Sequence, residues 1–234
     1  LGCDSIFALQ LYVNPTYTTN LSYTICEGST YTWYNQTLNA SGTYYHTLTS
    51  MSGCDSTLVL ALTVQPLPTV NIQASQQAIC DGGSVVLTAT GADSYVWSTN
   101  ESTTSITVSP NTTTIYSVTG TTNGCGDTAM ITITVNPLPQ ITITSSTTNL
   151  CPGSTTTLTA QGGQTYLWSN SSTTNPITVS PTITTTYSVT GTDANSCSSV
   201  ATVTITTLPT YNLSQTASIC QGDVYAWNGN NYAS

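Results

Sequence analysis

Ala-Met-Ile-Thr-Ile-Thr-Val, residues 129–135, alternates apolar and hydroxyl side chains with a period of two. Successive side chains of a strand point to opposite faces, so the two Ile and the Val share one face and the two central Thr share the other. An apolar face opposite a hydroxyl face is typical of a sheet that is buried on one side only. The same alternation predicts strands at residues 84–90, 105–109, 115–119 and 201–205, and no window shows a helical period with caps.

Two copies of one long module contain these strands. Residues 66–136 open with Pro-Leu-Pro-Thr-Val-Asn-Ile, and residues 137–207 open with Pro-Leu-Pro-Gln-Ile-Thr-Ile. Later landmarks recur in the same order in both copies. The matched pairs are Cys80 and Cys151, Trp97 and Trp168, Tyr116 and Tyr187, and Cys125 and Cys197. About six short strands per copy, with turn residues between them, are typical of an immunoglobulin-like sandwich in which these Trp and Tyr pack in the core.

A shorter module occupies residues 15–65, with Ile-Cys-Glu-Gly at 25–28 and Gly-Cys-Asp-Ser at 53–56. Residues 1–14 match its final part, and residues 208–234 match its beginning. We therefore expect an all-β chain, a linear array of small disulfide-stapled immunoglobulin-like β-sandwich modules. Its expected divisions are 1–14 (C-terminal part of a short module), 15–65 (short module), 66–136 and 137–207 (immunoglobulin-like modules) and 208–234 (N-terminal part of a short module).

Positive charge is missing from the composition. The chain has no Lys or Arg, nine acidic residues and one His, for a formal net charge of −9. It therefore cannot neutralise nucleic-acid phosphates or bind an anionic membrane through basic side chains. No apolar stretch approaches the roughly 18 residues that a spanning helix needs. We therefore expect neither nucleic-acid binding nor membrane insertion.

Eight cysteines, with no Cys-x-x-Cys pair and a single His, favour a disulfide framework over a zinc site. Such a framework indicates an oxidising, extracellular compartment, with the protein secreted or at the cell surface. Cys3 and Cys220 each lack a partner within their part of a module, so either the partners lie outside this sequence or Cys220 of one copy bonds Cys3 of the next. The repeats favour one bond within each complete module, namely Cys26–Cys54, Cys80–Cys125 and Cys151–Cys197.

Catalysis is not expected. His46, the one imidazole, lies in a predicted strand, and the nine acids form no catalytic motif. Calcium is the alternative to a chain without cofactors, because a Cys26–Cys54 bond would bring Glu27 and Asp55 together. Turn-forming carboxylates are the competing interpretation of those two acids.

Residues 66–207 resemble a known family. The segments Leu-Thr-Ala, Tyr-x-Trp-Ser, Ile-Thr-Val-Ser-Pro, Tyr-Ser-Val-Thr-Gly and Val-Asn-Pro-Leu-Pro are similar to the immunoglobulin-like (PKD-like) tandem repeats of giant Bacteroidota secreted surface and adhesin proteins, which are type IX secretion cargo. The resemblance implies surface display, adhesion or fibre formation. It also implies O-glycosylation at Asp-Ser/Thr segments, which places acceptors at Ser5, Ser56 and Thr128.

We expect a structural segment, a stalk or fibre, of a long extracellular repeat protein that serves cell-surface adhesion or filament formation. Its partners would be neighbouring repeats or copies of itself, joined head to tail or laterally. The alternative is a glycan-binding adhesive module that stacks surface sugars on exposed aromatic rings, for which the candidates are Tyr31, Tyr34, Tyr44 and Tyr45.

Overall fold

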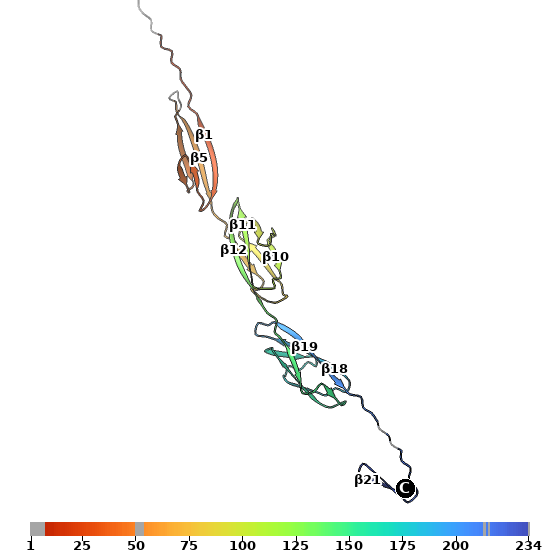
Figure 1. Ribbon diagram of the computed structural model, residues 1–234. Coiled ribbons are helices and arrows are strands. Elements are labelled where there is room, and N and C mark those ends of the chain that lie inside the picture. Colours follow the sequence, from red (N-terminus) through yellow and green to blue (C-terminus); the bar gives the residue numbers. More distant parts are fainter. Residues whose placement is uncertain (1–7, 50–53, 213, 215, 234) are drawn as a thin grey trace, which may run out of the picture. The chain divides into compact units, whose positions relative to one another are not determined.

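The computed structural model describes residues 8–49, 54–212, 214 and 216–233 (Figure 1). The chain divides into two compact units, Leu1–Asn136 and Pro137–Ser234. Every regular element in the described ranges is a β-strand. The described residues contain no helix that is long and apolar enough to cross a membrane. The fold is therefore all-β, and each unit is described by itself below.

Residues 66–136 form a sandwich of two sheets within the first unit. Its strands are β6 (Asn71–Ala74), β7 (Ala78–Cys80), β8 (Val85–Thr90), β9 (Ser94–Trp97), β10 (Ser105–Val108), β11 (Thr114–Thr122) and β12 (Cys125–Asn136). One sheet has the order β10-β8-β6 and the other β7-β12-β11-β9. All neighbours are antiparallel except β7 and β12, which run parallel. Two packed sheets with this strand order form an immunoglobulin-like sandwich, as the sequence predicts.

Residues 137–207 repeat this architecture in the second unit. The strands are β13 (Thr142–Ser145), β14 (Asn149–Leu150), β15 (Thr156–Gln161), β16 (Thr165–Trp168), β17 (Ile177–Val179), β18 (Thr185–Thr192) and β19 (Ser198–Thr207). The sheets have the orders β13-β15-β17 and β14-β19-β18-β16. Here β14 and β19 are the parallel pair. The two long copies thus share one topology, which follows from their shared pattern of apolar alternation.

The apolar faces predicted from sequence form the cores. On β12, Ile133 is buried and its neighbours Ile131 and Val135 are half-buried, whereas Thr132 is exposed. Ile133 packs in one cluster with residues of both sheets, and Ile205 does the same in the second copy. The period-two assignment of faces is therefore confirmed.

The two core tryptophans predicted from the repeats are confirmed. Trp97 and Trp168 are each 2% exposed. A buried indole N–H needs an acceptor, and the two indoles donate to backbone oxygens of Thr103 (2.8 Å) and Thr174 (3.1 Å). Tyr116 also lies in the core, and this burial raises the pKa of its hydroxyl.

Residues 15–65 make a smaller structure in the first unit. Its strands are β1 (Thr18–Cys26), β2 (Tyr31–Trp33), β3 (Gln36–Leu38), β4 (Gly42–Leu48) and β5 (Ser56–Gln65). β5 lies between β1, with which it pairs in parallel, and β4, while β2 and β3 form a separate hairpin. The buried side chains are Ile25, Trp33, Leu38, Leu60 and Leu62.

A final hairpin of β20 (Val224–Trp227) and β21 (Asn230–Ala233) belongs to the second unit. Adding 194 to the residue numbers of the β2–β3 hairpin gives this segment, so Tyr31 corresponds to Tyr225 and Trp33 to Trp227. The described residues around it form no further sheet with it. This hairpin is central to the site described below.

Gly91 lies in the β8–β9 turn, against the backbone of the segment that leads into β6. Its φ is +97°, and a Cβ added there would lie 1.9 Å from the backbone oxygen of Thr69. Gly82 also has a positive φ, of +81°, but an added Cβ would meet nothing within 4 Å. The two glycines therefore separate steric exclusion from left-handed backbone strain.

Gly91→Ala should lower the free energy of unfolding by more than about 2 kcal/mol, because backbone must move and the left-handed strain is added. Gly82→Ala carries only the strain, about 1 kcal/mol. Urea denaturation followed by tryptophan fluorescence measures both. Equal losses in the two variants would contradict the close approach of Thr69.

Candidate functional site

The first cysteine of each complete module lies at the end where that module's chain leaves it, which we call the trailing end. The cause is the parallel pairing of the strand before this cysteine with the module's last strand. Cys26 is in register with Gln65 and Cys80 with Asn136. In the second long copy Leu150 is in register with Thr207, and Cys151 follows directly.

The second cysteine of each module lies at the opposite, leading end, where the chain enters the module. Cys125 opens β12 after a two-residue Asn-Gly turn in which Asn123 and Gly124 both have positive φ. Near this turn an added Cβ on Gly120 would lie 2.7 Å from Val70, which is on the segment that enters the sandwich. Cys54 precedes β5. The N–H of Thr57, near the start of β5, donates a hydrogen bond to Tyr17 O on the segment that enters the module.

The disulfide that forms joins two different modules. Cys26, at the trailing end of residues 15–65, bonds Cys125, at the leading end of residues 66–136, with their Cα atoms 5.5 Å apart. Both cysteines lie in the first unit. The bond closes a sequence separation of 99 residues.

The bonds expected within single modules are therefore wrong. Cys26–Cys54 and Cys80–Cys125 are excluded by the Cys26–Cys125 bond, and Cys151–Cys197 is excluded because Cys151 carries a free thiol. The physical reason is distance. About ten residues of extended strand separate the two cysteines of a module, roughly 33 Å at about 3.3 Å per residue. A disulfide needs Cα atoms within about 7 Å.

The other cysteines differ in state. Cys80 and Cys197 are each disulfide-bonded. Cys54 is half-buried and Cys151 exposed, and within the described ranges both are free thiols. Cys220 is exposed. Cys3, for which the alternatives are a partner outside this sequence and an inter-copy bond, lies outside the described residues.

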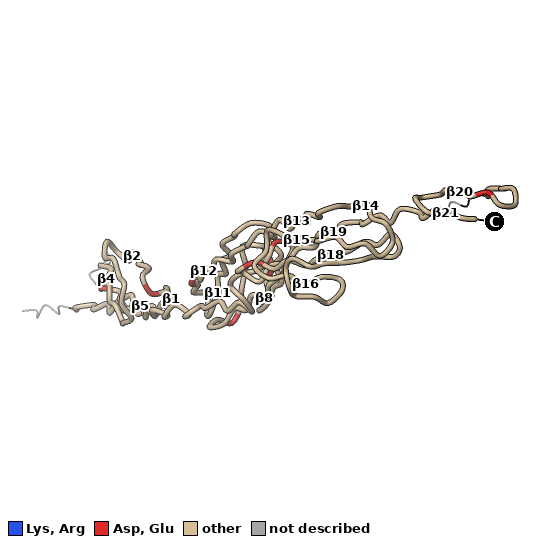
Figure 2. The backbone as a smooth tube through the Cα atoms, turned by 90° about the horizontal axis from the view of Figure 1, so that it is seen from below, with Lys and Arg blue, Asp and Glu red and all other residues tan. Residues whose placement is uncertain are grey.

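The calcium pair is also corrected. Glu27 lies at the trailing end, where its N–H donates to Gln65 O at 2.8 Å, whereas Asp55 lies at the leading end just before β5. The two carboxylates are thus at opposite ends of one module, and the Cys26–Cys54 bond that would have joined them does not exist. Figure 2 shows the acidic residues at scattered positions along the backbone, and the described residues contain no group of three potential metal ligands.

The tyrosines proposed as sugar platforms have different surroundings. Tyr34 is 48% exposed and stacks on His46, with ring centroids 3.7 Å apart. Trp33 makes edge contacts with both rings, at centroid distances of 5.5 Å from Tyr34 and 6.0 Å from His46. Tyr45 is exposed on the opposite face of β4. Two others are half-buried, Tyr31 against Tyr23 and Tyr44 with its hydroxyl donating to Ala40 O. The four rings therefore do not form one platform.

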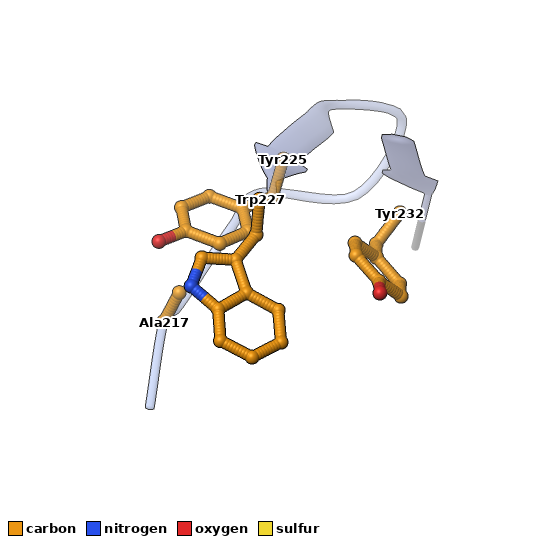
Figure 3. Close-up of a pocket in the computed structure, with 4 residues that line it drawn as sticks. All are labelled: Ala217, Tyr225, Trp227 and Tyr232. Carbon is orange, nitrogen blue, oxygen red and sulfur yellow. The ribbon is translucent and has the colours of Figure 1, made fainter. Parts of the chain in front are cut away.

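A hollow of about 240 Å³ lies against the final hairpin and is lined by Ala217, Tyr225, Trp227 and Tyr232. Figure 3 shows the three rings on the same side of the hairpin, as the pairing of Tyr225 with Tyr232 requires. In the complete short module the residues corresponding to Trp227 and Tyr232 are Trp33 and Leu38, which are 6% and 7% exposed. Trp227 and Tyr232 are 44% and 49% exposed. The rings of this hairpin are therefore exposed where the matching side chains of residues 15–65 are buried.

The candidate glycosylation positions have unequal access. Thr128 is exposed on β12, with its hydroxyl 3.0 Å from that of Thr119 on the adjacent strand. Ser56 is half-buried at the start of β5. Ser5 lies outside the described residues. Of the described positions, Thr128 offers the more accessible hydroxyl.

A second hollow, of about 700 Å³, was not anticipated from the sequence. It lies on β16, β18 and the loop near Asn175, in the second long copy. No sequence motif marks it, because its residues come from three separated segments. Its lining residues are uncharged, and most of them carry a hydroxyl or an amide group; they are Gln164, Thr165, Tyr166, Leu167, Thr173, Asn175, Thr190 and Thr192.

Solved structures resemble the chain only at low similarity. No family model matches it, and no curated protein matches it either. An ice-binding adhesin described as Ca²⁺-stabilized, from an Antarctic bacterium, is 18% identical at a TM-score of 0.40, over 72% of this chain and 56% of that one. The N-terminal eight immunoglobulin domains of the Down syndrome cell adhesion molecule are 10% identical at 0.39, over 77% and 31%. The C-terminal fragment of intimin, solved with its receptor's binding domain, is 15% identical at 0.37, over 60% and 64%. At these values the matches carry no argument about function, and the fold assignment depends on the strand order.

Replacing both Cys26 and Cys125 with Ser should lower the free energy of unfolding of the first unit by about 2–4 kcal/mol, because the closed loop no longer restrains the unfolded chain. Cys151→Ser, at an exposed free thiol, is the matched control and should change it by less than about 0.5 kcal/mol. Urea denaturation without reductant measures both. A double variant as stable as the parent chain would contradict the bond.

Proposed function

We propose that this chain is a structural segment, a stalk or fibre, of a long extracellular repeat protein that serves cell-surface adhesion or filament formation without catalysis. The observation that carries the proposal is the Cys26–Cys125 bond between two modules. A bond inside one module stabilises that module alone. A bond across a junction also passes tension from one module to the next without unfolding either core.

The bonded cysteines support an extracellular location, because disulfides persist in oxidising compartments. The surface supports it as well, since a chain without Lys or Arg offers no site for proteases that cut after basic residues. His46 has a structural role in this proposal, because its ring stacks on Tyr34 and contacts Trp33 in a cluster of three rings. We further propose that the whole protein is a giant Bacteroidota surface protein of the kind that residues 66–207 resemble.

We also propose the five-part division of the chain, with neighbouring repeats as its natural partners. Its support at the C-terminal end is the uncovered hairpin that matches β2 and β3. At the N-terminal end, Leu9 corresponds to Leu60 when 51 is added to its number. Leu60 is 1% exposed in the core, whereas Leu9 is 90% exposed. At both ends, residues that match the core of residues 15–65 are exposed, which supports the division.

Force spectroscopy on the full chain tests the stalk. With the Cys26–Cys125 bond intact, the residues between the two cysteines cannot extend. Complete stretching should therefore release about 34 nm less length than in the Cys26→Ser/Cys125→Ser variant, at about 3.5 Å per residue over the separation of 99. Equal lengths for the two proteins would show that tension does not pass through the bond and would overturn the mechanical basis of the proposal.

The alternative, a glycan-binding adhesive module, is favoured by the second hollow. Its size lies within the range of small-molecule sites, and its hydroxyl and amide groups could bind sugar hydroxyls.

For the stalk we expect no oligosaccharide on a glycan array to bind the purified chain. Binding that is retained by a Tyr45→Ala control but lost in Thr165→Ala/Thr192→Ala would establish the alternative and place it in this hollow. Tyr45 is a suitable control because it is exposed in a different module.

A further inference from the structure

Cys151 occupies the same place as two cysteines that are disulfide-bonded. At the trailing end of the second long copy, Leu208 N donates to Leu150 O at 2.8 Å, so Cys151 lies beside Leu208, one residue before Pro209. Cys26 lies beside Gln65, one residue before Pro66. In both cases the cysteine is at the junction with the following module.

The third member of the set has the same position. Cys80 is in register with Asn136, one residue before Pro137, and Asp81 N donates to Asn136 O at 2.9 Å. Cys26 is bonded to the second cysteine of the module that follows it, and Cys80 is disulfide-bonded as well. Cys151, in contrast, is exposed and carries a free thiol. Three equivalent positions with two bonded members indicate a bonding site, not an isolated thiol.

We propose that Cys151 is the covalent attachment site for the second cysteine of the short-type module that begins at Pro209. That partner is a thiol in a Gly-Cys-Asp-Ser segment of the kind at residues 53–56, which lies at the leading end of its module. Cys151 would then bond the second cysteine of the module that follows it, as Cys26 bonds Cys125. By the same rule Cys54, a second cysteine at a leading end, would bond the first cysteine of a module that precedes residue 15.

The bond forms by thiol–disulfide exchange with an oxidant of the disulfide class. The thiolate of one cysteine attacks the oxidant's S–S bond to give a mixed disulfide and release one thiol. The second cysteine then displaces the other sulfur. Overall the two cysteines lose two electrons and two protons, and the oxidant's disulfide becomes two thiols. The proposal deepens the stalk function, on which it rests, by naming the group that extends its covalent path.

The test is the full chain with a second copy of residues 41–65 fused after Ser234. By the offset of 194, this addition completes the module that begins at Pro209, and it supplies one new cysteine, the copy of Cys54. Non-reducing digestion with chymotrypsin and mass spectrometry should join the Cys151 peptide to that new cysteine, and alkylation of Cys151 should fall at least tenfold. Trypsin is unsuitable because the chain has no Lys or Arg.

The matched control carries Ser in place of the new cysteine, and Cys151 should again be fully alkylated. Trp227 fluorescence should shift to shorter wavelength in both fusions, because the added strands cover the exposed ring. A bond from the new cysteine to Cys220, or a free Cys151 in a fusion whose Trp227 is covered, would overturn the proposal. These outcomes leave the force measurement on Cys26–Cys125 unaffected, so the two proposals fail separately.

A second measurement does not depend on the folding of the fusion. In the protein secreted by its source cells, the same digestion should find Cys151 in a disulfide with a cysteine outside residues 137–207. Recovery of Cys151 as an alkylated thiol, or bonded to Cys197, would contradict the attachment site.

Discussion

The parallel pairing of an early strand with the last strand of each module is the constraint on which the cysteine arrangement depends. β1 with β5, β7 with β12 and β14 with β19 all run in the same direction. Each pairing ends at the trailing end of its module, and the first cysteine is there. The second cysteine must then lie a full strand length away, about 33 Å. A bond from the first cysteine can only cross the junction, as Cys26–Cys125 does.

This arrangement changes what a disulfide contributes to a small β-sandwich. Many sandwiches of this size join their two sheets by a bond through the core. Here that place is filled by apolar side chains around Trp97 and Trp168, each with its indole N–H satisfied by a backbone oxygen. The sheets are held by apolar burial, and the bonded pair Cys26–Cys125 holds one module to the next. Stability within modules and continuity between modules thus come from separate groups.

The aromatic hollow of the final hairpin illustrates how an internal repeat can decide the meaning of a surface feature. Three rings around a hollow would ordinarily suggest a ligand site. The complete copy at residues 15–65 instead shows the equivalent ring of Trp33 buried with Leu60 and Leu62. The same chemistry is thus buried in a core at Trp33 and exposed at Trp227. The repeats give no such explanation for the second hollow, on β16 and β18, and this hollow is therefore the observation that favours the glycan-binding alternative.

The sequence by itself determined the strand faces, the repeats and the core. The alternation at residues 129–135 placed Ile133 inside and Thr132 outside, and the repeat placed Trp97 and Trp168 in equivalent cores. Side-chain period and internal similarity are local properties, so they can be read along the chain. Only the tertiary structure decided which cysteine Cys26 bonds, where Glu27 lies relative to Asp55, and which segments line the second hollow. The direction in which β7 meets β12 depends on residues more than 40 positions apart, and spacing along the chain does not distinguish parallel from antiparallel pairing. That direction places the two cysteines of a module at opposite ends and makes the disulfide a link between modules.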